Sequence, residues 1–367
     1  MDRAGLRQAI MSWLRRPRGQ LGCHHPETWE IVNGYRFAMG SRPVVTLCGE
    51  ATDFTTLITA LDTSTPKRRL LRLGLLVAAR LRLFPIIARR LSESESEEVE
   101  MLTAPMHRIA TEQGRQLRAL AVVWPGGDRI HRRYVTGVDA KGTMCLFTKV
   151  TLDPALDWYL LQNEMMLLDS LAERPISGVR TPRVFYAECV GCQGAVVMEA
   201  IPAKREHLDW AAVRELLPLR GPTGWRELEA GEVPWLDRGL DVEMSDSFRE
   251  CVNHALSQGL MVGVVNGDVR PNNVVVSGGD TWLFDWEYAA FDAPANTDLV
   301  AALLNARTQR TDPDKAAEVL VDFIGDLPKA GVSVFDAAVS LLYLSTVAHP
   351  WALLLMKREW PPIADAC

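Results

Sequence analysis

The alternation of apolar and polar positions divides the chain into a strand-rich part followed by a helix-rich part. The apolar runs 119–123 and 144–150 and the alternation over 129–137 predict three antiparallel strands joined by turns, and a further apolar strand is expected over 195–198. Beyond that strand the apolar spacing becomes helical over 207–217, 247–261, 299–308, 313–324 and 334–356. The pattern therefore predicts an α+β protein with a small antiparallel sheet first and a mostly helical part after it.

The first 112 residues follow a different pattern. Residues 28–51 indicate short strands and turns, and the Leu- and Arg-rich stretch 67–90 predicts a helix that Pro85 kinks or ends. The acidic run 92–100 is interpreted as a solvated linker. Three interpretations of 67–90 stay open, namely packing on the sheet or on a second copy in a homodimer, peripheral contact with a membrane, and a mobile regulatory segment. We expect three regions, which are an N-terminal extension (1–112), a sheet lobe (113–202) and a helical lobe (203–367).

Composition narrows the class of protein. The 367 residues are 48% hydrophobic and 23% charged, as in a globular protein with a sizeable core. The net charge of −6 argues against a nucleic-acid partner. Seven scattered cysteines, an odd number, favour a reducing compartment, and no secretory signal is evident, so we expect a cytoplasmic protein.

Chemically useful side chains gather between the apolar runs 260–265, 274–276 and 282–284, which are expected to form a buried helix end and two short strands. Asp268 is followed five residues later by Asn273, and Asp285 comes directly after the last run. Phosphoryl transfer from ATP needs a carboxylate that accepts the proton of the attacking hydroxyl, together with oxygen ligands for Mg²⁺. The alternative is that Asp268 and Asn273 only cap a turn.

This segment resembles the catalytic loop of the aminoglycoside phosphotransferase and choline kinase group, a small-molecule branch of the protein-kinase-like fold. The resemblance implies a two-lobe kinase-like fold and the following roles: Asp268 catalytic, Asn273 and Asp285 metal ligands, and Glu287 and Asp298 supporting residues. Asn266 stands where that group has His. An Asn amide also donates and accepts hydrogen bonds, so we expect Asn266 to support the loop.

The resemblance also implies an ATP-binding lobe upstream. Gly126 and Gly127 would form a short phosphate loop, because glycine lets backbone N–H groups approach phosphate oxygens closely; the alternative is a plain hairpin turn. Lys149 would reach the phosphates as a point charge, held by an ion pair with Glu164 on the following helix.

Two further groups of residues complete the expected site. Backbone groups from Glu199 to Ile201 would bind the adenine edge at the hinge between the lobes. The candidates for contact with the acceptor are Trp225, Trp235, Asp237, Arg238 and Trp286. The alternative for this last set is an ordinary loop anchored by buried indoles.

Together, the motifs predict an ATP- and Mg²⁺-dependent phosphotransferase that acts on a hydroxyl of a small molecule, such as a sugar, an aminoglycoside or an amino alcohol. The helical region lacks a dense acidic cluster that would attract a polycation, so a sugar is at least as good a candidate as an antibiotic. Two alternatives stay open. Asn266 suggests a weak or inactive nucleotide-binding scaffold, and a protein kinase is the other, although a long Gly-rich loop is missing.

Overall fold

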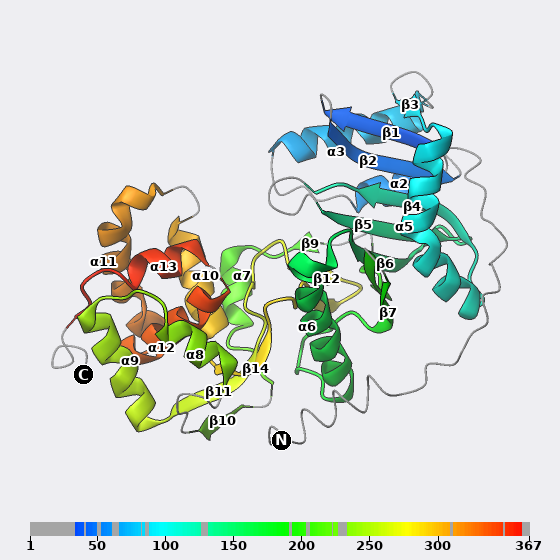
Figure 1. The fold of residues 1–367 in the computed structure, drawn as a ribbon. Coiled ribbons are helices and arrows are strands. Elements are labelled where there is room, and N and C mark those ends of the chain that lie inside the picture. Colours follow the sequence, from blue (N-terminus) through cyan, green and yellow to red (C-terminus); the bar gives the residue numbers. More distant parts are fainter. Residues whose placement is uncertain are drawn as a thin grey trace.

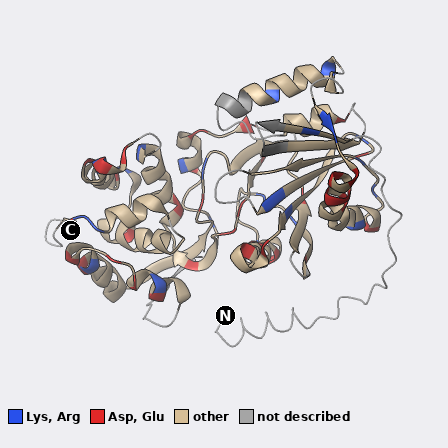
Figure 2. Ribbon diagram, turned by 45° about the horizontal axis from the view of Figure 1, so that its top comes forward, with Lys and Arg blue, Asp and Glu red and all other residues tan. Residues whose placement is uncertain are grey.

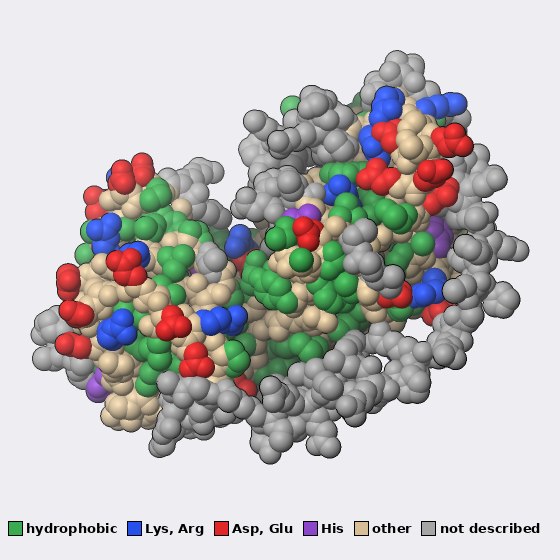
Figure 3. Space-filling model, in the orientation of Figure 1, with side chains coloured by type: hydrophobic (Ala, Val, Ile, Leu, Met, Phe, Trp, Pro, Cys, Tyr) green, Lys and Arg blue, Asp and Glu red, His purple; other side chains and the backbone are tan. Residues whose placement is uncertain are grey.

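The structure is a computed structural model, which describes residues 34–39, 42–49, 53–60, 66–81, 83–84, 88–125, 131–190, 193–202, 206–221, 223–226, 233–308, 311–347 and 349–361. Its elements form a lobe built around a large sheet and a second lobe built mainly of helices (Figure 1). The space-filling view shows a notch between the two lobes (Figure 3). The expected mixed α and β class, with an antiparallel sheet and helices, is confirmed.

One antiparallel sheet of eight strands organises the first lobe, in the order β3-β1-β2-β4-β5-β6-β8-β7. Its strands are β1 (Gly34–Met39), β2 (Arg42–Gly49), β3 (Arg89–Arg90), β4 (Leu117–Val123), β5 (Arg132–Asp139), β6 (Met144–Thr151), β7 (Val184–Val190) and β8 (Gln193–Glu199). The strands expected over 119–150 are present as β4, β5 and β6. Because β2 pairs with β4, the strands of the N-terminal extension belong to the same sheet as β4 to β8. The expected boundary at 112/113 falls between α5 and β4, and the sheet continues across it.

Side chains alternate between the two faces of this sheet, as the period of two requires. Ala119 and Ala121 of β4 contribute to one apolar cluster, whereas Leu120 and Val122 contribute to another on the opposite face. The first face carries α2 (Phe54–Thr59) and α3 (Pro66–Arg80), and α6 (Pro154–Glu173) packs beside β7 and β8. The opposite face carries α5 (Glu93–Glu112). The face with α2 and α6 is the one that carries Lys149.

The acidic run at 92–100 is a helix and not a linker, so that expectation was wrong. Ser92 and Glu95 form a capping box, in which the Ser92 backbone N–H donates to Glu95 Oε2 at 2.9 Å. The acidic first turn also interacts favourably with the helix dipole. The first buried residue of α5 is Val99, six residues after the helix begins at Glu93. The start of this helix therefore has no apolar spacing from which a helix could be predicted.

The second lobe combines helices with two small sheets, ordered β10-β11-β14 and β13-β12-β9. Its helices are α7 (Trp210–Glu215), α8 (Pro234–Leu240), α9 (Asp246–Gln258), α10 (Thr297–Thr308), α11 (Ala316–Asp326), α12 (Val334–Thr346) and α13 (Pro350–Leu355), with the 3-10 turns η2 (Pro313–Lys315) and η3 (Pro328–Ala330). Its strands are β9 (Glu206–His207), β10 (Thr223–Arg226), β11 (Leu260–Val265), β12 (Val274–Ser277), β13 (Asp280–Leu283) and β14 (Ala290–Pro294). A large apolar cluster of helix and strand residues forms the core of this lobe.

Three expected helices are shorter than the pattern indicated. The helix expected over 247–261 ends at Gln258, because Gly259 has φ 77° and the chain continues as strand β11, not as a helix end. The helix expected over 334–356 breaks before Pro350, where His349 caps α13. Only α7 forms within 207–217, since His207 belongs to β9.

Among the described residues no single helix is long and apolar enough to cross a bilayer. One bent pair of segments, Pro313–Ala330 with Val334–Thr346, meets the same length and composition criteria at an angle of 118°. The four cysteines in the described part, Cys48, Cys145, Cys189 and Cys251, are free thiols.

Candidate functional site

A cavity of about 680 Å³ lies between the two lobes, within the size range of small-molecule sites. From the first lobe it is lined by residues of α2, β4, β5, β6, α6 and β8, and from the second by the loop that carries Asp268 and the loop after β13. The junction between α12 and α13 also contributes to the lining. Seven predicted site residues line this one cavity: Lys149, Glu164, Glu199, Ile201, Asp268, Asn273 and Asp285.

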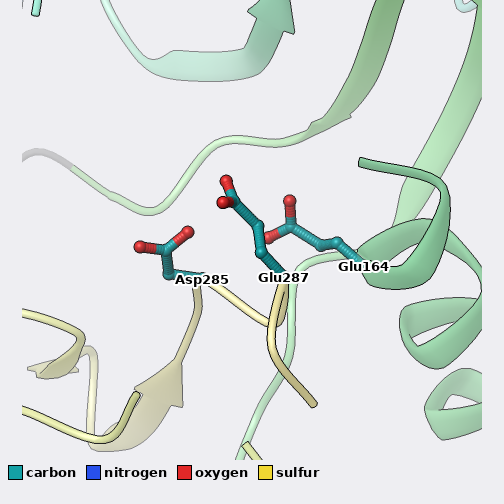
Figure 4. Close-up of side chains that lie close together, drawn as sticks. All are labelled: Glu164, Asp285 and Glu287. Atoms are coloured by element: carbon teal, nitrogen blue, oxygen red, sulfur yellow. The ribbon is translucent and has the colours of Figure 1, made fainter. Parts of the chain in front are cut away.

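Three carboxylates converge on the Lys149 ammonium. Its Nζ lies 2.7 Å from Asp285 Oδ1, 2.8 Å from Glu164 Oε2 and 2.9 Å from Glu287 Oε1. The expected ion pair with Glu164 is therefore present, and two further acids join it. Figure 4 shows the three carboxylates gathered in one small region, Glu164 from α6 and the other two from the loop after β13.

Burial and charge act in opposite directions on this cluster. Burial by itself would lower the pKa of the Lys149 ammonium, but the carboxylates of Asp285, Glu164 and Glu287 outweigh it and hold that pKa well above its ordinary value. Burial raises the pKa of the Glu164 carboxyl, and the Lys149 charge opposes that rise. Lys149 therefore stays protonated and remains a positive charge at one end of the cavity.

Arg132 is a second buried cation, which the sequence analysis missed. At 2% exposure, its Nη1 donates to Glu287 Oε1 at 2.6 Å, and its Nε donates to Asp157. His131 Nε2 lies 2.9 Å from the same Asp157 carboxylate. Alternation over 129–137 did place Arg132 in a strand, but nothing in the sequence indicates that its side chain points inward, toward an acid more than a hundred residues away.

The loop that carries Asp268 is held by the buried carboxylate of Asp298 on α10. Asp298 accepts hydrogen bonds from the backbone N–H groups of Asn266 and Gly267, both at 2.8 Å. Burial raises the pKa of Asp298 to about 7, while the two backbone N–H donors act to lower it. Gly267 has φ 82°, and a Cβ there would lie 2.5 Å from the Tyr288 carbonyl oxygen, so the loop requires glycine at this position.

Asp268 lies at the centre of this loop. Asn273 Nδ2 donates to its backbone carbonyl at 2.8 Å and to its Oδ2 at 3.3 Å. Arg270 Nη2 lies 2.5 Å from Asp268 Oδ1, and the Arg270 side chain is half exposed. The carboxylate is thus oriented from both sides and still lines the cavity.

Asp285 has an unusual backbone. Its φ is 65°, in the left-handed region, and it is the one residue other than glycine with positive φ in the described chain. Asn266 Nδ2 donates to its carbonyl oxygen at 3.2 Å, and the next backbone N–H, of Trp286, donates to Glu164 Oε1 at 3.1 Å. Such strain persists only where the surroundings hold it, which is common at functional sites.

Two sets of oxygen ligands are candidates for binding a divalent cation. The Glu164, Asp285 and Glu287 oxygens lie within 4.8 Å of one another, but the Lys149 ammonium already contacts all three. Asn273 and Asp285 line the same cavity, and the Asn273 amide nitrogen is used by Asp268, which leaves its oxygen as the ligand atom. Amide and carboxylate oxygens suit Mg²⁺, so Asn273 and Asp285 fit the ion.

The remaining predicted residues fall in different places. Gly126 and Gly127 lie outside the described residues. Glu199 and Ile201 line the cavity where β8 ends. Trp225 lies in β10, opposite Met261 of β11.

The other acceptor candidates do not reach the cavity. Trp235 is buried in the helical core, where its Nε1 donates to the Asp292 carbonyl at 2.8 Å, and Trp286 is buried with its Nε1 bonded to the Leu283 carbonyl. Asp237 and Arg238 lie on α8, and none of these four lines the cavity. The interpretation of Trp235 and Trp286 as packing indoles therefore describes them better.

The cavity wall contains residues that the sequence analysis did not select. Leu57 and Ala60 come from α2 and its end, and Val347, His349 and Pro350 come from the junction between α12 and α13. Burial lowers the pKa of the His349 imidazole to about 4, and the charge of Arg270 adds to this effect. In the sequence, Pro350 alone indicated a break in the helix at this junction, since proline is common at the first position of a helix.

Comparison with known proteins gives matches among solved structures alone; no family model and no curated protein sequence matches this chain. It is similar to a thermostable mutant of aminoglycoside phosphotransferase APH(4)-Ia, solved with ADP and hygromycin B (14% identity, 65% of this chain and 88% of that one, TM-score 0.38). It is also similar to aminoglycoside phosphotransferase APH(3'')-Id from Streptomyces rimosus, solved with ADP and streptomycin (14%, 67% and 98%, TM-score 0.36).

A third similarity is to monomeric WbdD, with 15% identity and a TM-score of 0.27. The match covers 58% of this chain and 44% of the WbdD chain. At these low TM-scores the similarities assign neither an activity nor a substrate to this chain.

Proposed function

We propose that this protein is an ATP-dependent phosphotransferase that transfers the γ-phosphate to a hydroxyl of a small molecule. The observation that carries the proposal is the convergence of Lys149, Asp268, Asn273 and Asp285 in one interlobe cavity. These side chains come from both lobes, and together they offer a cation for phosphate, an oriented carboxylate and two oxygen ligands.

The nucleotide would occupy the part of the cavity under the large sheet. Val123, Tyr134 and Phe147 supply an apolar and aromatic roof there, and the Tyr134 and Phe147 rings stack with centroids 6.0 Å apart. Glu199 at the end of β8 and Ile201 just after it line this region, where the base would be held. Lys149 would bind the phosphates, with Glu164 and Glu287 holding its ammonium in place.

Asn273 and Asp285 would hold Mg²⁺, which when bound neutralises charge on the phosphates. Asp268 would orient the acceptor hydroxyl and accept its proton as the oxygen attacks the γ-phosphate. Asn273 and Arg270 fix the direction of the Asp268 carboxylate before the substrate arrives. Positioning and charge neutralisation supply most of the catalysis in such a reaction.

The acceptor would lie between Asp268 and the α12–α13 junction. Tyr288, Val347, His349 and Pro350 line this end, and in the described part of the wall it contributes no acidic side chain of its own. A polycationic antibiotic bound at this end could pair with no carboxylate of the described wall other than those proposed to act on ATP and the acceptor. The wall therefore favours a neutral or anionic acceptor, and we propose a sugar or a sugar-derived metabolite.

The test is ADP release by the purified full chain with Mg-ATP over a panel of sugars, amino alcohols and aminoglycosides. Asp268→Asn should lower turnover by about a thousandfold while ATP still binds, and the exposed Asp314→Asn should behave as the parent protein. Nucleotide binding without turnover over the whole panel would favour the scaffold alternative. Transfer to a protein, and to none of the small acceptors, would favour a protein kinase.

A further inference from the structure

Helix α3 is apolar on two opposite faces. Its inner residues Leu75, Ala78 and Ala79 are buried in the cluster beneath β1, β2 and β4. The side chains on its outer face, together with Leu81 directly after its last turn, are exposed to the following extents: Leu70 72%, Leu73 59%, Val77 47% and Leu81 62%. A Cβ added at Gly74, on the same face, would have no atom within 4 Å. The outer face is therefore apolar and uncovered by any described residue.

The exposed side chains form one continuous stripe. Their spacing of three, seven and eleven residues from Leu70 keeps them on one side of an α-helix over about 16 Å. The described chain exposes nine large hydrophobic residues, and four of them belong to this stripe. Soluble proteins seldom expose so concentrated an apolar patch unless it binds something.

The segment around the stripe carries only positive charge. Residues 66–90 contain eight basic residues and no acid, although the chain as a whole has a net charge of −6; the eight are Lys67, Arg68, Arg69, Arg72, Arg80, Arg82, Arg89 and Arg90. Figure 2 shows basic residues and no acidic one along α3. Of these, Arg89 is paired with Glu95, and Arg72 donates to the Thr59 carbonyl at 3.2 Å. Arg80 is exposed in the last turn, next to the stripe.

We propose that the outer face of α3 docks on an anionic lipid surface. Apolar side chains flanked by Lys and Arg on a surface helix suit the boundary between lipid headgroups and acyl chains. A second copy of the chain would bring two such basic segments together, and their like charges would repel. Anionic headgroups instead complement the positive charge of this segment.

Flotation of the full chain with lipid vesicles tests this proposal. The protein should float with vesicles that contain phosphatidylglycerol, should not float with pure phosphatidylcholine, and should be released by high salt. The double variant Leu70→Asp/Leu73→Asp should lower vesicle affinity by about tenfold or more, because two leucines no longer enter the apolar layer. Both positions are exposed, so the melting temperature should stay close to that of the parent protein.

A matched control changes two exposed apolar residues elsewhere, Leu156→Asp on α6 with Val321→Asp on α11, and should keep full vesicle binding. The proposal is overturned if the parent protein ignores anionic vesicles, or if the α3 double variant binds them equally well. Light scattering provides the remaining outcome. A dimer that the α3 variant abolishes, without any vesicle binding, would assign the stripe to a second copy and overturn the lipid proposal.

Discussion

Asn266 links the backbones of Asp268 and Asp285, since its Nδ2 donates to the Asp285 carbonyl and its Oδ1 accepts from the Asp268 backbone N–H, at 3.2 and 3.1 Å. The side chain is fully buried, so both bonds are made away from water. An imidazole could make similar bonds with one donor and one acceptor nitrogen. Asn266 thus connects the two loops directly, in the place where the resemblance leads one to expect His.

Asn266→Ala should lower kcat by about 10- to 100-fold with little change in the KM for ATP, because Asp268 and Asp285 would lose their shared support. Asn266→His should retain more activity than Asn266→Ala. Steady-state kinetics with the best acceptor measures both, and the exposed Asn253→Ala provides the control. Parental kcat in Asn266→Ala would show that the link has no functional role.

Arg132→Met should destabilise the fold by about 3–5 kcal/mol, because Glu287 and Asp157 would stay buried without this cation. Arg180 is a matched control, since it also pairs with two carboxylates, Glu199 and Asp280, but is half exposed. Arg180→Met should cost about 1 kcal/mol or less. Denaturant unfolding of both variants compares them directly, and equal losses would contradict a structural role for burial at Arg132.

Ala60→Trp should weaken ATP binding by about tenfold or more, because Ala60 lines the proposed nucleotide cavity and an indole would fill part of that space. Calorimetric titration with ATP measures the effect, and thermal melting checks the fold. Ala140→Trp, in the exposed turn between β5 and β6, is the control. Unchanged affinity in Ala60→Trp would mean that α2 does not border the nucleotide.

His349 should make stability depend on pH. Burial lowers its folded pKa to about 4, whereas an unfolded histidine titrates near 6.5, so the unfolded chain binds more protons between these values. The contribution of the neutral imidazole is complete above about pH 6.5 and decreases as the pH falls toward 4.

His349→Asn keeps a side-chain acceptor for the Ala352 N–H and removes the titrating group. Its loss of stability relative to the parent protein should therefore be smaller at pH 5 than at pH 7, by about 2 kcal/mol. Denaturant titrations at the two pH values provide the comparison. A difference that does not change with pH would exclude a depressed pKa at His349.

Local sequence determined much of this protein. Short apolar runs predicted β4 and β6, and alternation predicted β5, because side chains on a strand alternate between two faces. The spacing of Asp268, Asn273 and Asp285 predicted a shared site, because one tight loop and one hairpin bring them together. Residues within such a short segment need few long-range contacts to meet.

Tertiary structure decided the remaining features. Whether a side chain is buried depends on the distant segments that pack against it, and the local sequence does not specify those segments. The apolar run 260–265 is compatible with either a buried helix end or a buried strand. It forms strand β11 because it pairs with β10 and β14. Arg132 appears in sequence as one cation among forty, and only the fold directs it into a buried cluster with Glu287. Likewise α2 becomes a wall of the cavity through its packing on β4 and β5, a contact between distant segments that no local pattern encodes.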